Sequence, residues 1–233
     1  MQHIEMWHRG QVSPRLALVS CAPYHVYPHE IPVDRTSRVS GERAVRQAWL
    51  FADDDSCKGL DDMSYDAAMD APLPELAPHV LQDMYAHARE TYPEECCGLL
   101  LGANDSIVID TVRRCVNEQN RYHELDPERF PRTAREGYFL GGKDLRFLME
   151  SISSSRPVKV IYHSHPDVGA YFSDEDTRAA LGREPDDTAE PQYPVDHIVI
   201  DAQPDHIAGA KLFRWSPSTR TFVQAAAYAG ERS

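Results

Sequence analysis

Two histidines and one aspartate stand at a spacing that could hold a metal ion. His163 and His165 are separated by one residue and followed at once by Pro166; Ser173 comes after six further residues, and Asp176 three positions later. Side chains at positions i and i+2 of an extended chain point to the same side, so both imidazoles can converge on one ion. A carboxylate from a following helix would add a third ligand and leave a fourth tetrahedral position for water, as catalytic zinc sites require.

Each fragment of this pattern also has a purely structural interpretation. A lone His-x-His is often incidental, and Ser-x-x-Asp is close to a helix capping box, with Ser173 as the N-cap and Asp176 as the third helical residue. The five positions together would arise by chance in about one chain in several thousand of this composition. Capping and metal binding are compatible, because a cap fixes the first helical turn and so aims Asp176.

The elements that must position these residues can be predicted from apolar periodicity. The VKVIYH segment, at 158–163, predicts the strand that ends in the histidines. The continuous apolar run at 96–102 predicts a buried strand, and the alternation at 106–116 predicts its antiparallel neighbour. A helix with one buried face, ending near Tyr92 and Pro93, is indicated by apolar residues at three- and four-residue spacing, namely Leu76, Val80, Leu81, Met84 and Ala88.

The remaining segments complete a predicted single α/β domain over residues 73–233. Residues 117–142 are predicted to be mixed and loop-like, a second amphipathic helix is predicted between Leu145 and Ile152, and three later segments (DHIVIDA, AGAKLFRW and RTFVQA) predict strands. The expected fold class is therefore a mixed β-sheet flanked by helices.

Residues 1–72 give much weaker signals. A strand could lie at 13–20 and a short helix or strand at 41–52, before an acidic linker at 53–70. This region is interpreted as an N-terminal extension or small accessory region of unknown fold.

Composition limits the cellular context and the partners. The net charge of -13 argues against a broad electrostatic grip on nucleic acid or anionic lipid. Five cysteines, an odd number with two adjacent, do not resemble a secreted disulfide framework. No signal peptide or membrane span is evident, so a cytoplasmic location is predicted. The sequence predicts no oligomeric state.

The motif as a whole resembles that of the JAMM/MPN+ zinc metalloproteases, which is a distant Glu followed by His-x-His-Pro, six residues and Ser-x-x-Asp. In that family the Glu lies in a Pro-x-Glu-x-x-Gly context, which residues 93–98 match with Glu95 in the corresponding place. The resemblance spans roughly residues 73–225 and implies the three-layer, cytidine-deaminase-like JAMM/MPN fold. It does not extend to residues 1–72.

The resemblance implies a role for each matching residue. His163, His165 and Asp176 would bind Zn²⁺, and Glu95 would take a proton from the activated water and pass it to the leaving amine. Ser173 would donate a hydrogen bond to the oxyanion, as in related hydrolytic sites. Glu94 is the competing base, since adjacent residues of an extended chain point to opposite faces and only one of the two can address the metal.

The resemblance also implies a substrate class. The segment after Asp176 lacks the Cys- and His-containing insertion of some eukaryotic deubiquitinases, so the chain is similar to the prokaryotic branch. The expected substrate is the C-terminal tail of a ubiquitin-like or sulfur-carrier protein, from which an amino acid such as cysteine or a conjugated lysine would be released. An extended tail could pair with a strand edge near residues 103–125.

Two other functions stay open at this stage. The site could serve a non-catalytic MPN-type interaction module, or the chain could be a relative of the DNA-repair RadC group, although its acidity counts against the latter.

Four further residues have structural interpretations that compete with functional ones. Cys96 and Cys97 are predicted to be small buried hydrophobes rather than zinc ligands or nucleophiles. For His197 and His206 a surface or hydrogen-bonding role is predicted.

Overall fold

The computed structural model describes residues 72–232. The segments predicted at 13–20, 41–52 and 53–70 lie outside the described residues, so they and the domain boundary near residue 73 stay predictions. The elements in chain order are β1 (Glu75–Leu76), α2 (Pro78–Thr91), β2 (Cys97–Leu101), β3 (Val108–Ile109), β4 (Thr111–Cys115), α3 (Gln119–Leu125), α4 (Gly142–Ser151), β5 (Val158–Pro166), α5 (Asp174–Leu181), β6 (Asp196–Ala202), β7 (His206–Ser216) and β8 (Thr221–Arg232).

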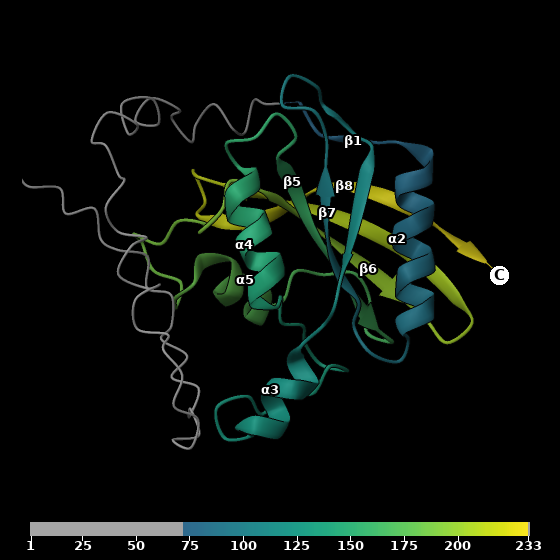
Figure 1. The fold of residues 1–233 in the computed structure, drawn as a ribbon, viewed down its shortest axis with the longest axis vertical. Helices are drawn as coiled ribbons and strands as arrows, with labels where there is room; N and C mark the ends of the chain where they lie inside the picture. Colours follow the sequence, from purple (N-terminus) through teal and green to yellow (C-terminus); the bar gives the residue numbers. More distant parts are fainter. Residues whose placement is uncertain (1–71, 233) are drawn as a thin grey trace, which may run out of the picture. The chain divides into compact units, whose positions relative to one another are not determined.

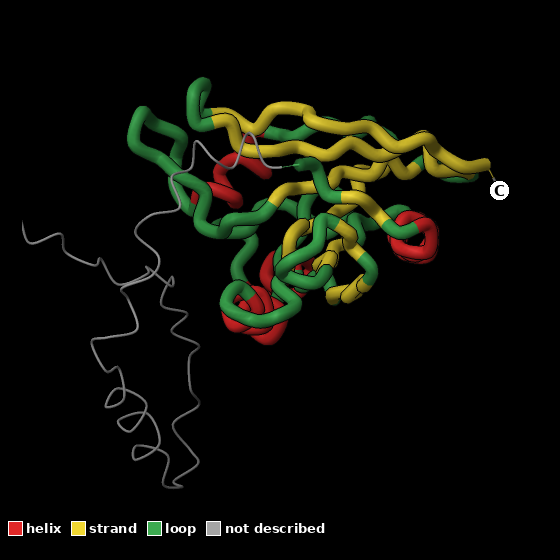
Figure 2. Tube along the Cα trace, turned by 90° about the horizontal axis from the view of Figure 1, so that it is seen from above, coloured by secondary structure: helices red, strands yellow, loops and turns green. Residues whose placement is uncertain are grey.

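A mixed six-stranded sheet forms the centre of the described part of the chain (Figure 1). Its strand order is β4-β2-β5-β6-β7-β8, in which β5 and β6 run parallel and the other neighbours run antiparallel. The long strands β7 and β8 lie side by side at one edge (Figure 2). Strands β1 and β3 pair separately as a short parallel ladder.

Helices cover both faces of this sheet, with α2 on one side and α4 and α5 on the other (Figure 1). Because side chains of a strand alternate between faces, Tyr162 and Ile198 pack in the same cluster as Met84 of α2. Ile161 points the other way and packs in the cluster that contains Leu148 of α4. The predicted fold class, a mixed sheet flanked by helices, is confirmed.

The main strands and helices fall where apolar periodicity predicts them, with two differences at the start of the domain. Helix α2 begins at Pro78, whose fixed φ suits a first helical position, so Leu76 lies in β1 instead. The strand predicted over 106–116 is divided at Asp110 into β3 and β4, which pair with different neighbours. The Asp110 carboxylate accepts hydrogen bonds from Thr111 and Arg156 at this break.

The segment predicted to be loop-like contains helix α3. Its sequence, QNRYHEL, has no apolar stripe that would reveal a helix. The side chain of Asn117 accepts a hydrogen bond from the backbone N–H of Gln119, the first residue of the helix. Among residues 72–232, no helix is long and apolar enough to cross a membrane.

Candidate metal centre

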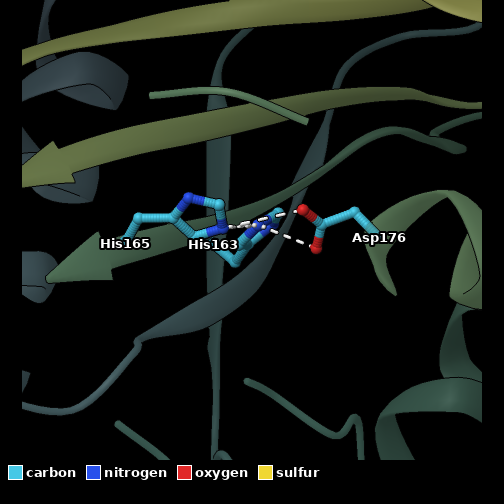
Figure 3. A group of neighbouring side chains, drawn as sticks. All are labelled: His163, His165 and Asp176. Carbon is cyan, nitrogen blue, oxygen red and sulfur yellow. Dashed lines mark hydrogen bonds and ion pairs between the residues drawn. The ribbon is translucent and has the colours of Figure 1, made fainter. Parts of the chain in front are cut away.

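Strand β5 presents His163 and His165 on the sheet face that α4 and α5 cover. Their Nε2 atoms lie 3.1 Å apart, and both side chains are almost fully buried. Asp176 reaches toward them from the first turn of α5, with Oδ1 at 3.2 Å from Nε2 of His163 and Oδ2 at 3.6 Å from Nε2 of His165. Figure 3 shows the three side chains pointing toward one another from the strand and the helix.

Asp176 is aimed by a complete capping box at the start of α5. The Ser173 hydroxyl accepts a hydrogen bond from the backbone N–H of Asp176, and the Asp176 carboxylate accepts one from the backbone N–H of Ser173 at 2.8 Å. The Ser173 hydroxyl lies 2.6 Å from the same carboxylate oxygen. The structure thus shows that one aspartate caps a helix with one oxygen while the other oxygen faces His163.

The donor set fits a divalent metal ion. The ligand atoms of His163, His165 and Asp176 all lie within 4.8 Å of one another and are buried. Nδ1 of His165 lies 3.2 Å from the carbonyl oxygen of Gly169, which can only accept, so Nδ1 donates and Nε2 keeps its lone pair for the centre. Two imidazole nitrogens and one carboxylate oxygen with this kind of support are typical of a protein metal site.

The electrostatics favour the metal-binding protonation states of His163 and Asp176. Burial lowers the pKa of His163, against the opposing influence of Asp176, and so favours the neutral imidazole. Burial works against ionisation of Asp176, but the facing imidazoles and the Ser173 hydroxyl outweigh it and hold the pKa of Asp176 well below its usual range. Neutral imidazoles and an ionised carboxylate are the forms that bind metal.

Glu95 lies on the same face as the histidines, at the entry to β2. Cys97 pairs with His163, and Cys96 and Ser164 exchange hydrogen bonds, so the same antiparallel register sets Glu95 opposite His165. Directly opposed residues of an antiparallel pair share a face. Burial raises the pKa of Glu95 to about 9, Asp176 adds to the rise, and Arg132 partly offsets it.

Glu94, the competing base, points elsewhere. It is exposed, and its carboxylate accepts a hydrogen bond from the Asn120 side chain at 2.8 Å. Of the two adjacent glutamates, only Glu95 is buried next to the candidate metal centre.

A segment that the sequence did not associate with the site covers it. The Tyr138 ring stacks on the His163 ring, with centroids 4.6 Å apart and an interplanar angle of 25°. The backbone N–H of Glu95 donates to the carbonyl of Ala134 at 2.7 Å. Arg132 pairs with Glu175 on α5. Nothing in the spacing of these residues signals their position, because it depends on how residues 126–140 fold back over the sheet.

The serine between the two histidines is a second residue that sequence reasoning missed. Its hydroxyl accepts a hydrogen bond from the backbone N–H of Cys96 at 2.9 Å, and its backbone N–H donates to the Cys96 carbonyl. Ser164 therefore joins β5 to β2 at the level of the site and helps to hold Glu95 in place.

The cysteine prediction agrees with the structure, whereas one histidine prediction was wrong. Cys96 and Cys97 are buried, and burial raises the pKa of both thiols. His206 is partly exposed and lies 2.7 Å from the Asp205 carboxylate. His197 is not at the surface: it is only 4% exposed and packs between Phe172 and Phe222. Its buried Nδ1 has no hydrogen-bond partner among the described residues. The aromatic residues that enclose it come from distant segments, which its local sequence does not reveal.

Comparison with known proteins places the chain in a family. The profile described as prokaryotic homologs of the JAB domain matches residues 77–213, more than half of the chain. The chain therefore belongs to this prokaryotic JAB family, and the resemblance to JAMM/MPN proteins is confirmed.

Similar solved structures come from Desulfitobacterium hafniense, Salinibacter ruber and Archaeoglobus fulgidus. A solution structure from Desulfitobacterium hafniense is 22% identical, with a TM-score of 0.45, and the match covers 64% of this chain and 88% of that one. A solution structure from Salinibacter ruber is 20% identical, with a TM-score of 0.42 and coverage of 65% and 88%. A crystal structure of a JAB1/MPN domain protein from Archaeoglobus fulgidus is 17% identical, with a TM-score of 0.33 and coverage of 56% and 79%. No curated protein matches the sequence.

Proposed function

We propose that the chain is a zinc-dependent peptidase or isopeptidase that hydrolyses an amide bond at the C-terminus of a ubiquitin-like or sulfur-carrier protein. The observation that carries the proposal is the buried group of His163, His165 and Asp176 with Glu95 buried beside it on the same sheet face. Membership of the prokaryotic JAB family supports it.

The two histidines and Asp176 would hold Zn²⁺ through two imidazole nitrogens and one carboxylate oxygen. When bound there, zinc supplies a Lewis acid and lowers the pKa of a coordinated water to about 7. Stacking of Tyr138 on His163 and the hydrogen bond from His165 to Gly169 fix both imidazole rings in orientation.

Glu95 would carry the proton between the attacking water and the leaving amine. Its buried position raises the pKa of its carboxyl group, and a nearby divalent cation would lower it again by favouring the ionised form. A carboxyl group held between these opposing influences can gain and lose a proton near neutral pH, as a general acid–base requires.

Ser173 would stabilise the oxyanion by donating a hydrogen bond, which elsewhere contributes about 3 kcal/mol. In the structure its hydroxyl lies 2.6 Å from an Asp176 carboxylate oxygen. The proposed role therefore requires the hydroxyl to turn from that carboxylate toward the substrate.

The substrate tail would approach along β4. This strand ends the sheet, so its outer edge has backbone groups free of a neighbouring strand among the described residues. An extended tail can add to such an edge through backbone hydrogen bonds. Every residue of the intervening strand β2 is buried, so the tail would turn from the β4 edge toward the histidines without crossing the face of β2.

The test compares two adjacent glutamates in the full chain loaded with one equivalent of zinc. Cleavage of a ubiquitin-like protein carrying a C-terminal extension is followed by mass spectrometry. Glu95→Gln should reduce turnover by at least about a hundredfold, while its metal content stays at one equivalent. The matched control, Glu94→Gln, alters an exposed carboxylate and should retain turnover. Cleavage that survives complete metal removal, or equal activity of the Glu95→Gln variant, would refute the proposal. A non-catalytic interaction module would bind the fusion without cleaving it.

A further inference from the structure

A cavity of about 430 Å³ adjoins the candidate metal centre on the side of β6 and β7. The loop after Pro166 separates the two. Within that loop Gly169 accepts the hydrogen bond of His165, and the Tyr171 ring centroid lies 4.9 Å from that of His165. Both residues also line the cavity. The cavity, named here the β7 groove, therefore shares a wall with the site.

The strand register places one cationic residue of the groove in line with a predicted ligand. His163 pairs with Val199 on β6, and Val199 pairs with Lys211 on β7. Paired residues share a sheet face, so Lys211 lies on the face that carries the site, and its backbone is two strand spacings, or about 10 Å, from that of His163. Lys211 lines the β7 groove.

The walls of the groove are suited to a small peptide with an anionic end. Much of the lining is small, with Gly169, Ala170, Ala208, Gly209 and Ala227 leaving room for backbone. Within residues 72–232, Lys211 forms none of the ion pairs that the structure shows.

Asp201 is the other charged residue that lines the groove. Its carboxylate accepts a hydrogen bond from the Gln203 side chain. Asp201 lies two residues after Val199 on β6 and pairs with His165 on β5. Its negative charge would repel a bound carboxylate, which would therefore lie at the Lys211 side of the groove.

We propose that the β7 groove holds the leaving-group side of the substrate and that Lys211 binds the C-terminal carboxylate of the released segment. This inference rests on the proposed function and narrows its substrate class. If the acyl tail enters from β4, the leaving group lies on the opposite side of β5 and would reach the groove past the loop that carries Gly169 and Tyr171.

Because Lys211 would recognise a free carboxylate, the chain would release a segment that ends in one in preference to a lysine side chain joined to a second protein.

The first test measures binding alone. The full chain with one equivalent of zinc is titrated with the dipeptide Ala-Ala and with Ala-Ala amide, and binding is followed by NMR shifts. The acid should bind about tenfold more tightly than the amide. Lys211→Met should abolish this difference, Lys211→Arg should retain part of it, and Lys143→Met, at an exposed lysine on α4, should leave it unchanged. Equal affinities for acid and amide, absence of saturable binding at millimolar concentration, or a preference that persists in Lys211→Met would overturn the inference.

The second test measures cleavage with matched substrates. One ubiquitin-like protein is prepared with a C-terminal Ala-Ala acid, with an Ala-Ala amide and with an isopeptide-linked lysine whose own carboxyl group is amidated. The kcat/KM for the acid should be about tenfold above that for either alternative, and Lys211→Met should remove the difference. Equal cleavage of all three would reject the inference and leave the proposed function intact. Lys211-dependent binding of Ala-Ala without cleavage of any substrate would reject the proposed function and leave the groove inference standing.

Discussion

The Nδ1–H of His165 donates a hydrogen bond to the carbonyl oxygen of Gly169 over 3.2 Å. This contact selects the tautomer in which Nε2 carries the lone pair that faces His163 and Asp176. Gly169 can present its carbonyl in this direction because its φ is +91°, a conformation that L side chains rarely adopt. A glycine in the loop after the His-x-His-Pro motif therefore orients one of the predicted ligands.

Gly169→Ala should weaken metal binding by about tenfold to a hundredfold, because the strained backbone would move the carbonyl that orients His165. Zinc affinity can be measured by competition with a chromophoric chelator. Gly142→Ala is the matched control: Gly142 is the first residue of α4, and an added Cβ there meets nothing within 4 Å. Equal zinc affinities in the two variants would show that the Gly169 carbonyl has no such role.

The sequence was sufficient to predict the parts of the site that depend on local regularity. A strand places His163 and His165 on one side through its two-residue period, and a capping box fixes Asp176 through the first turn of a helix. Burial of the apolar run that starts at Cys96 follows from composition alone. These rules need only neighbours in the chain, and the structure agrees with each of them.

The parts that the sequence could not predict depend on long-range folding. Tyr138 stacks on His163 because residues 126–140 fold back over the sheet, and no periodic pattern describes that path. Burial of His197 depends on Phe172 and Phe222, which lie in different segments. The position of Lys211 relative to His163 depends on the pairing order of three strands, which propensities do not specify.

Ser173→Ala should lower the free energy of unfolding of the metal-free protein by about 1 kcal/mol, the usual cost of losing an N-cap side chain. The reason is that the alanine cannot accept the hydrogen bond from the backbone N–H of Asp176. Urea unfolding in the presence of a chelator measures the effect, and Ser173→Thr should retain most of the stability. Ser153→Ala, at an exposed serine after α4, serves as the control. If Ser173→Ala and Ser153→Ala unfold at the same urea concentration, the cap has no measurable energetic role.

The three described cysteines should resist alkylation in the folded protein. Burial raises the pKa of Cys96 and of Cys115 to about 12 each and raises that of Cys97 as well, so the reactive thiolate is scarce and shielded. Iodoacetamide labelling followed by mass spectrometry of the individual peptides should detect modification at these positions only after denaturation. Rapid labelling of Cys96 in the folded chain would reopen a chemical role for that thiol.

His197 should make the metal-free protein less stable as the pH falls. Burial lowers the pKa of His197 from 6.5 to about 3, with His163 adding to the shift and Asp176 opposing it. Between these two pH values the unfolded chain binds a proton at this residue while the folded chain does not. The free energy of unfolding should therefore decrease as the pH is lowered through this window, by up to about 1.4 kcal/mol per pH unit from this residue.

His197→Phe removes the titrating group while keeping an aromatic ring among Phe172, Phe213 and Phe222. Urea unfolding of the metal-free variant and of the metal-free unaltered chain from pH 8 to pH 4 separates two effects. The difference at pH 8, where the histidine is neutral in both folded and unfolded chains, reports packing alone. Below pH 6.5 the free energy of unfolding should fall less steeply with decreasing pH in the variant than in the unaltered chain. The two slopes should differ by up to the contribution of one proton, about 1.4 kcal/mol per pH unit. If the free energies of unfolding of the two proteins change in parallel with pH over the whole range, His197 takes up its proton while the chain stays folded. Its ring would then be less well shielded from solvent than its 4% exposure implies.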